Sequence, residues 1–120
     1  MKKFSYDRQR AKQILPLLSS IGTEITERLQ AIRKLEVEIA KQAEDVGSES
    51  TVLNLRAELA EQRRALRKSR EELEHLGCQE ADAGKAQILI PGIDGSMERG
   101  FRWELGDETV HRVKASEQAA

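Results

Sequence analysis

Hydrophobic residues recur every seven positions along the first half of the chain, in two series whose gaps alternate between three and four residues. This is the a/d heptad spacing of helices that pack along a shared seam, with β-branched residues concentrated at the a positions. We therefore predict a helix over residues 5–46, with Ser5 as its N-cap and a break or kink at Pro16, because proline removes a backbone donor. The a series consists of Leu18, Ile25, Ile32, Ile39 and Val46, and the d series of Ile14, Ile21, Arg28, Leu35 and Gln42.

A turn-like cluster at residues 47–50 precedes a second heptad pattern, which stops at Gly77. Glycine suits the left-handed conformation that commonly ends a helix. Two helices with matching seams and a short connection fold back on each other, so the pattern predicts an antiparallel coiled-coil hairpin over residues 1–76. The second helix carries Val52, Leu59, Leu66 and Leu73 at a, and Leu55, Gln62, Ser69 and Leu76 at d.

Four d positions of this seam are polar. Each polar residue reduces apolar burial but helps to fix the register, because a slipped pairing strands it against hydrocarbon. The guanidinium of Arg28 is expected near the second half of the second helix, where glutamates could receive it. The polar d residues are Arg28, Gln42, Gln62 and Ser69, and the glutamates are Glu71, Glu72 and Glu74.

The apolar stripe of the first helix is broader than a two-helix seam needs. Leu29 lies beside it, and Leu15, Leu17 and Leu53 lie off it altogether. A broad stripe indicates contact with more than one neighbour, so we expect two hairpins to form a homodimeric four-helix bundle. The residues expected to carry the packing and the interface are Leu18, Ile21, Ile25, Ile32, Ile39, Leu59, Leu66 and Leu73.

Beyond Gly77 the composition changes, and residues 77–113 are predicted to form a small β-meander packed on the hairpin. Residues 79–84 are expected to be a loop, residues 86–90 a strand and residues 91–95 a turn. Residues 101–105 alternate strictly between apolar and polar, which predicts a strand with Trp103 on its buried face as the anchor. A tight turn at residues 106–107 then leads into a strand at 108–113, and residues 114–120 are expected to be a frayed tail. This register places Trp103 opposite Val110 and Arg102 opposite His111.

Composition narrows the possible partners and compartments. In 120 residues, 34% are charged against roughly 25% in typical globular domains, only 3% are aromatic, and the formal net charge is −1. A near-neutral chain has no overall field that draws it onto nucleic acid or anionic lipid. Apolar runs are far shorter than the ~20 residues that span a bilayer, and residues 5–10 are polar where a secretory signal would be apolar. The single cysteine, Cys78, fits a reducing compartment, so we expect a cytoplasmic protein.

Two clusters of basic residues are candidates for nucleic-acid binding. The run at residues 63–70 is flanked by glutamates at helical spacing, which favours a solvated, self-paired helix face with pairs such as Arg67–Glu71 and Arg70–Glu74. The cluster before Pro16 is offset by Asp7 alone, and is the better candidate for an acidic partner. We expect no nucleic-acid binding. The second cluster comprises Lys2, Lys3, Arg8, Arg10 and Lys12.

Few residues could support catalysis or metal binding. His75, Cys78 and His111 are too few for a supported zinc site, so no metal or cofactor is expected. Cys78 follows a helix C-terminus, where the helix dipole disfavours a thiolate. Polar and apolar groups could converge only in the meander, as a rim of ion pairs around a packed tryptophan or as a ligand pocket. The candidate pocket residues are Asp94, Arg102, Trp103, Asp107 and His111.

Several motifs resemble one known family across nearly the whole chain. The most specific is the run at residues 103–107 followed by His111; others are Tyr6, Ala11, Leu15-Pro16, Gly77, Ile90-Pro91 and Asp94-Gly95. Together they are similar to the prokaryotic proteins catalogued as domain of unknown function 2203. Where the family pattern has a cysteine, this chain has Arg102, and where it has an aromatic and an acidic residue around the histidine, this chain has Val110 and Arg112. A glycine-rich, arginine-containing ending is also missing. Any metal or catalytic centre built on those family residues would lack parts here.

Two functions remain open at this point. The leading hypothesis is a non-enzymatic helical interaction or scaffold protein that self-associates or docks a partner helix. The alternative is a small-molecule or metal-dependent enzyme with a pocket at the meander and the base of the bundle. The first expects His111 at the surface and a broad apolar contact between chains, whereas the second needs His111 facing an enclosed pocket.

Overall fold

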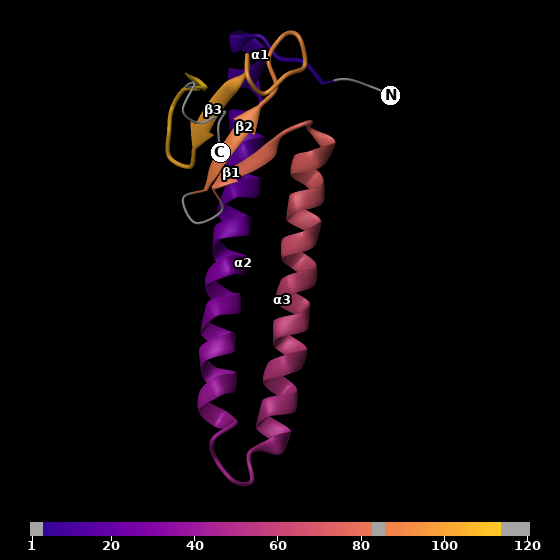
Figure 1. Ribbon diagram of the computed structural model, residues 1–120, viewed down its shortest axis with the longest axis vertical. Helices are drawn as coiled ribbons and strands as arrows, with labels where there is room; N and C mark the ends of the chain where they lie inside the picture. Colours follow the sequence, from indigo (N-terminus) through magenta and orange to yellow (C-terminus); the bar gives the residue numbers. More distant parts are fainter. Residues whose placement is uncertain (1–3, 83–85, 114–120) are drawn as a thin grey trace.

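The computed structural model describes residues 4–82 and 86–113, which form a long helical hairpin with a small antiparallel sheet at one end (Figure 1). The tail at 114–120, together with Lys2, Lys3 and the end of the predicted loop at 79–84, lies outside the described residues. The described part of the chain is elongated, with principal extents of 58 × 28 × 26 Å. The predicted mainly helical hairpin with a C-terminal meander is confirmed.

The break before Pro16 is confirmed and lies at Ile14. Helix α1 covers Arg8–Gln13, and α2 covers Leu15–Gln42 with the proline in its first turn, where the missing backbone donor costs nothing. The prediction of Ser5 as N-cap was wrong. Asp7 caps α1 instead, because its carboxylate accepts a hydrogen bond from the backbone N–H of Arg10 at 2.8 Å.

The connection between the long helices begins earlier than predicted. Helix α2 ends at Gln42, and α3 covers Glu49–His75, so the turn occupies residues 43–48. Ser48 stands at the N-cap position, but its hydroxyl donates to the backbone carbonyls of Gln42 and Asp45 and so braces the turn rather than the helix. At the far end Gly77 has a φ of +78°, as a left-handed helix terminator requires.

The seam between α2 and α3 buries the predicted apolar residues within a single chain. Leu18, Ile25 and Ile32 are buried from α2, and Leu59, Leu66 and Leu73 from α3, with Ile21 also buried and Ile39 half-buried. Arg28 does not reach the glutamates at 71–74, and that prediction was wrong. Its guanidinium donates to the side-chain oxygens of Gln62 at 3.2 Å and Glu24 at 3.3 Å. The two polar d residues therefore meet in one layer of the seam, which leaves neither facing hydrocarbon alone.

The sheet has four antiparallel strands in sequence order: β1 (Gln79–Asp82), β2 (Gln87–Ile90), β3 (Phe101–Glu104) and β4 (His111–Arg112). The prediction of a loop at 79–84 was wrong for the described residues of that segment. β1 has no apolar alternation; it forms because its backbone pairs with β2 at the sheet edge, with Glu80 opposite Ile88. An ion pair between Glu80 and Arg70 of α3 also holds it, in place of the predicted Arg70–Glu74 pair.

The predicted register of the last hairpin is confirmed at Arg102, which lies opposite His111. The last strand is shorter than predicted, with only two residues instead of six. The cause is Asp107, whose backbone N–H donates to the Glu104 carbonyl while its carboxylate accepts from the Glu104 N–H at 3.1 Å. These bonds commit the chain to a curled loop, so no ladder forms beside it.

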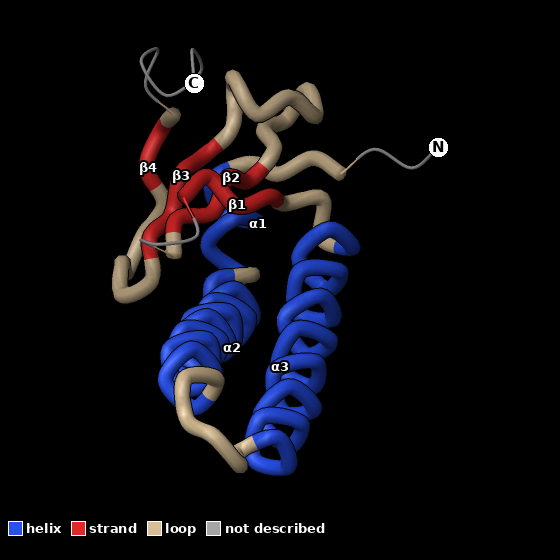
Figure 2. Tube along the Cα trace, turned by 60° about the horizontal axis from the view of Figure 1, so that its bottom comes forward, coloured by secondary structure: helices blue, strands red, loops and turns tan. Residues whose placement is uncertain are grey.

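The sheet packs against the first half of α2, at the end of the hairpin away from the α2–α3 connection (Figure 2). Trp103 is 1% exposed and anchors it, as predicted, by lying over Gly22 of α2. A Cβ atom built at Gly22 would lie 3.6 Å from both the indole and Leu105. Buried Ile88, Ile90 and Val110 complete the core at this end of the molecule.

Candidate functional site

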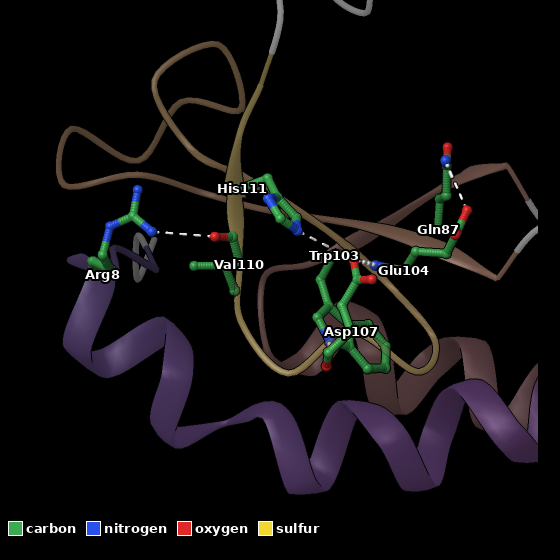
Figure 3. Close-up of polar contacts among 7 residues, drawn as sticks. All are labelled: Arg8, Gln87, Trp103, Glu104, Asp107, Val110 and His111. Carbon is green, nitrogen blue, oxygen red and sulfur yellow. Dashed lines mark hydrogen bonds and ion pairs between the residues drawn. The ribbon is translucent and has the colours of Figure 1, made fainter.

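Three of the five candidate pocket residues, Trp103, Asp107 and His111, come together at the curled loop after β3 (Figure 3), and a fourth lies beside them in the sheet. The indole N–H of Trp103 donates to the backbone carbonyl of Asp107 at 3.0 Å. The carboxylate of Asp107 lies 3.5 Å from Nε2 of His111, which is exposed, and Arg102 lies opposite His111 in the sheet. The indole itself faces α2, so this group closes a loop and does not line an enclosed pocket.

Asp94, the remaining candidate, lies in the separate loop between β2 and β3. Its carboxylate accepts hydrogen bonds from the backbone N–H of Ser96 at 2.9 Å and from the Ser96 hydroxyl at 2.8 Å, and lies 3.8 Å from Nε of Arg99. The bonds from Ser96, and secondarily the charge of Arg99, hold the pKa of Asp94 below its usual range. The structure thus divides the five candidates between two places.

A shallow depression of about 290 Å³ lies beside Asp94, between the start of α1 and the sheet. Two guanidinium groups converge there on one aromatic ring, since Cζ of Arg8 lies 5.6 Å and Cζ of Arg112 lies 5.7 Å from the Phe101 ring centre. The grouping of Arg8, Phe101 and Arg112 at one place was not predicted from the sequence. Strict alternation in β3 places Phe101 on the buried face with Trp103. The two arginines, however, are about a hundred positions apart in the sequence, so no local pattern indicates that they meet at this ring. The lining residues are Tyr6, Asp7, Arg8, Ile93, Asp94, Arg99, Phe101 and Arg112.

A second hollow, of about 390 Å³, lies along the hairpin where α2 and α3 face each other beyond the sheet. We call it the hairpin groove. Its apolar part is formed by Leu29, Ile32 and Leu66, and its rim by Arg63, Arg67 and Arg70 of α3. Leu29 is the residue whose position beside the heptad stripe predicted contact with a further neighbour, and it is half-buried.

The rim arginines differ in their ion pairs. Arg63 lies 3.3 Å from the carboxylate of Glu36, and Arg70 pairs with Glu80. Arg67 is exposed and forms no ion pair within the described ranges 4–82 and 86–113, so the predicted Arg67–Glu71 pair does not form. The groove therefore combines an apolar floor with an uncompensated positive charge.

Cys78 is buried and His75 is exposed, so the two do not form half of a metal site. Burial raises the pKa of the Cys78 thiol to about 12, which keeps it protonated at neutral pH. Within the described residues there is no group of three or more His, Cys, Asp or Glu side chains placed to hold a metal ion. Among the same residues, no helix has both the length and the apolarity to cross a membrane.

Two residues of the sequence motifs described above, Tyr6 and Ala11, are buried at the sheet end of the molecule. Tyr6 is buried, its hydroxyl donates to the Leu76 carbonyl at 2.7 Å, and its backbone N–H donates to the carbonyl of Gly92. Ala11 is also fully buried. The motifs thus hold together the start of the chain, the end of α3 and the loop after β2.

Comparison with known proteins identifies one matching family. No curated protein and no solved structure matches the chain. The sequence profile of one family matches residues 4–118, which is nearly the whole chain. The chain belongs to that family, the uncharacterised conserved proteins of DUF2203.

Proposed function

We propose that this protein is a non-enzymatic helical interaction protein that docks an amphipathic helix of a partner in the hairpin groove. The observation that carries the proposal is the groove itself, an apolar floor with an arginine rim on the face of the helical hairpin. Helix-in-groove recognition uses this combination, in which apolar contacts supply affinity and flanking charges select the partner.

The architecture supports this location because a layer of two helices leaves a flank of its seam uncovered unless something packs on it. The sheet covers that flank at one end, where Trp103 lies over Gly22. Arg70 belongs both to the groove and, through Glu80, to the sheet edge, so the groove continues from the edge of the sheet. A bound helix would extend the covering layer that the sheet begins.

Charge selects the kind of helix. A second copy that used the same groove would bring the two Arg67 side chains and their neighbours toward each other, and like charges in a desolvated contact are costly. A helix with glutamates or aspartates beside its apolar stripe would instead compensate Arg67. We therefore propose a partner with an acidic amphipathic helix, in preference to a homodimer through this groove. The reduced, buried Cys78 suits the cytoplasm, which is the compartment that we propose.

The experiment compares two designed helical peptides that share leucine heptads and carry either glutamate or lysine at the flanking positions. Fluorescence anisotropy should show saturable binding of the glutamate peptide, weakened by salt because the contact is partly electrostatic, and no binding of the lysine peptide. Arg67→Glu should weaken glutamate-peptide binding about tenfold or more, by analogy with charge pairs at interfaces.

Lys68→Glu is the matched control. It makes the same change of charge on the next residue of α3, but Lys68 does not line the groove, so binding should be unchanged. Equal binding of both peptides, binding of neither, or equal losses in the two variants would contradict the proposal. Light scattering could instead give a mass of twice 13.5 kDa. If that dimer did not bind the peptide, the groove would be assigned to a second copy of the chain.

A further inference from the structure

We propose that the depression between α1 and the sheet is a binding site for a small organic phosphate. It lies at the sheet end of the molecule, where α1 and the loop after β2 meet, and shares no lining residue with the hairpin groove. The inference is therefore independent of the docking function. It rests on three features of the described residues: the placement of two arginines, the balance of charge and the apolar floor.

Arg8 and Arg112 are brought together by the ring of Phe101. Phe101 is 4% exposed and forms part of the core, so its ring is a fixed floor. The guanidinium groups lie within cation–π range of that ring, at 5.6 Å and 5.7 Å. Arg8 is held further by a hydrogen bond from its Nη1 to the backbone carbonyl of Val110 at 3.1 Å, which Figure 3 shows.

The two carboxylates that line the depression accept hydrogen bonds from residues close to them in the sequence. Asp7 caps α1 by accepting from the backbone of Arg10, and Asp94 accepts from Ser96 and lies near Arg99. Among the described residues, neither Arg8 nor Arg112 forms an ion pair with a carboxylate. The lining thus carries three arginines against two aspartates, and this excess of positive charge favours an anion in the depression.

The chemistry of the two arginines points to phosphate. A guanidinium presents a planar fork of donors that matches phosphate oxygens, and a phosphate monoester carries close to two negative charges near neutral pH. The remaining lining is apolar, with buried Tyr6 below and Ile93, 75% exposed, at the rim. A volume of about 290 Å³ suits a small molecule, whose organic part would contact these side chains.

The test uses phenyl phosphate as the probe, with inorganic phosphate, benzoate and the uncharged benzyl alcohol as comparison ligands. Amide chemical shifts of ¹⁵N-labelled protein should move saturably at residues 93–101 and 110–113 with phenyl phosphate. Inorganic phosphate and benzoate should bind at least severalfold more weakly, and benzyl alcohol should leave the shifts unchanged.

Arg112→Gln should weaken phenyl phosphate binding at least tenfold, and Arg112→Lys should weaken it less, because lysine keeps the charge but not the fork. Arg33→Gln, which removes an exposed arginine of α2 that does not line the depression, is the matched control and should bind as the parent does. Unchanged dispersion of the amide spectrum shows that each variant is folded. Shifts that move elsewhere or do not saturate, inorganic phosphate that binds as tightly as the ester, or full affinity in a folded Arg112→Gln variant would overturn the proposal.

Discussion

At the scale of single residues, the sheet end of the hairpin is held by side chains that join distant parts of the sequence. The Tyr6 hydroxyl satisfies the Leu76 carbonyl, which lies at the end of α3 where helix carbonyls lack intrahelical partners. Arg8 reaches Val110 in the same way. These contacts give the short N-terminal segment a fixed position beside the sheet, and that position creates the phosphate-binding depression.

Contacts of this kind were not predictable from the sequence. Trp103 was identified as an anchor because alternation in its strand gives its direction without knowledge of the fold. Arg28 was recognised as a polar seam residue, but its partner depends on the register of α2 against α3. A heptad pattern allows several registers, and only the packed structure shows that Gln62 stands opposite.

The thiol of Cys78 gives a prediction at this scale. Because burial raises its pKa from 9.0 to about 12, almost no thiolate exists at pH 8, and the native protein should react with a disulfide reagent at least tenfold more slowly than the urea-unfolded chain. The buried, protonated thiol contributes to the free energy of unfolding, and this contribution is fully present below pH 9. It is lost as pH rises toward 12, because Cys78 of the unfolded chain ionises first. Equal reaction rates in the native and unfolded protein would show that the thiol is accessible.

At the scale of elements, the helices and two of the strands were predictable because each has its own periodicity. The first and last turns of the helices were harder to predict. α2 ends at Gln42, and the chain then turns through Gly47, whose φ of +89° favours glycine. Val46 is fully exposed and contributes nothing to the seam. β1 has polar residues and no alternation, and it depends on backbone pairing with β2 and on the ion pair between Glu80 and Arg70.

The contact between α2 and the sheet gives a prediction about Gly22. Alanine at this helical position should raise the free energy of unfolding by about 0.5–1 kcal/mol, because glycine costs that much in a helix interior. The added Cβ would meet Trp103 and Leu105 at 3.6 Å, which is ordinary contact. Urea unfolding followed by circular dichroism measures the difference.

Gly100→Ala is the opposite control, because an added Cβ would clash with the backbone oxygen of Ile90 and the backbone there would have to move. That variant should be strongly destabilised. A loss of stability in Gly22→Ala would mean that the sheet packs closer to α2 than the structure shows.

At the scale of the whole molecule, the fold separates two surfaces. The sheet end gathers the buried aromatic residues Tyr6, Phe101 and Trp103 and the phosphate-binding depression, while the hairpin extends away from it and carries the groove. The candidate site was only partly predictable for this reason. The sequence placed Asp94 and His111 in one meander, but strands and loops of a meander emerge at different ends of a sheet, and the curled loop at Asp107 directs His111 away from Asp94.

The shape itself is testable in solution. The Cα radius of gyration is 17.9 Å, whereas a compact domain of the same length would have one of about 14 Å. If the hairpin groove awaits a different protein, dilute protein should scatter X-rays with a radius of gyration near 18 Å and a mass of 13.5 kDa. A glutamate-flanked peptide in the groove should raise the mass by that of one peptide and change the radius little, because it lies alongside the helices. Doubled mass at every concentration would instead mean that the exposed faces of two hairpins cover each other, and the groove would then be closed to a partner.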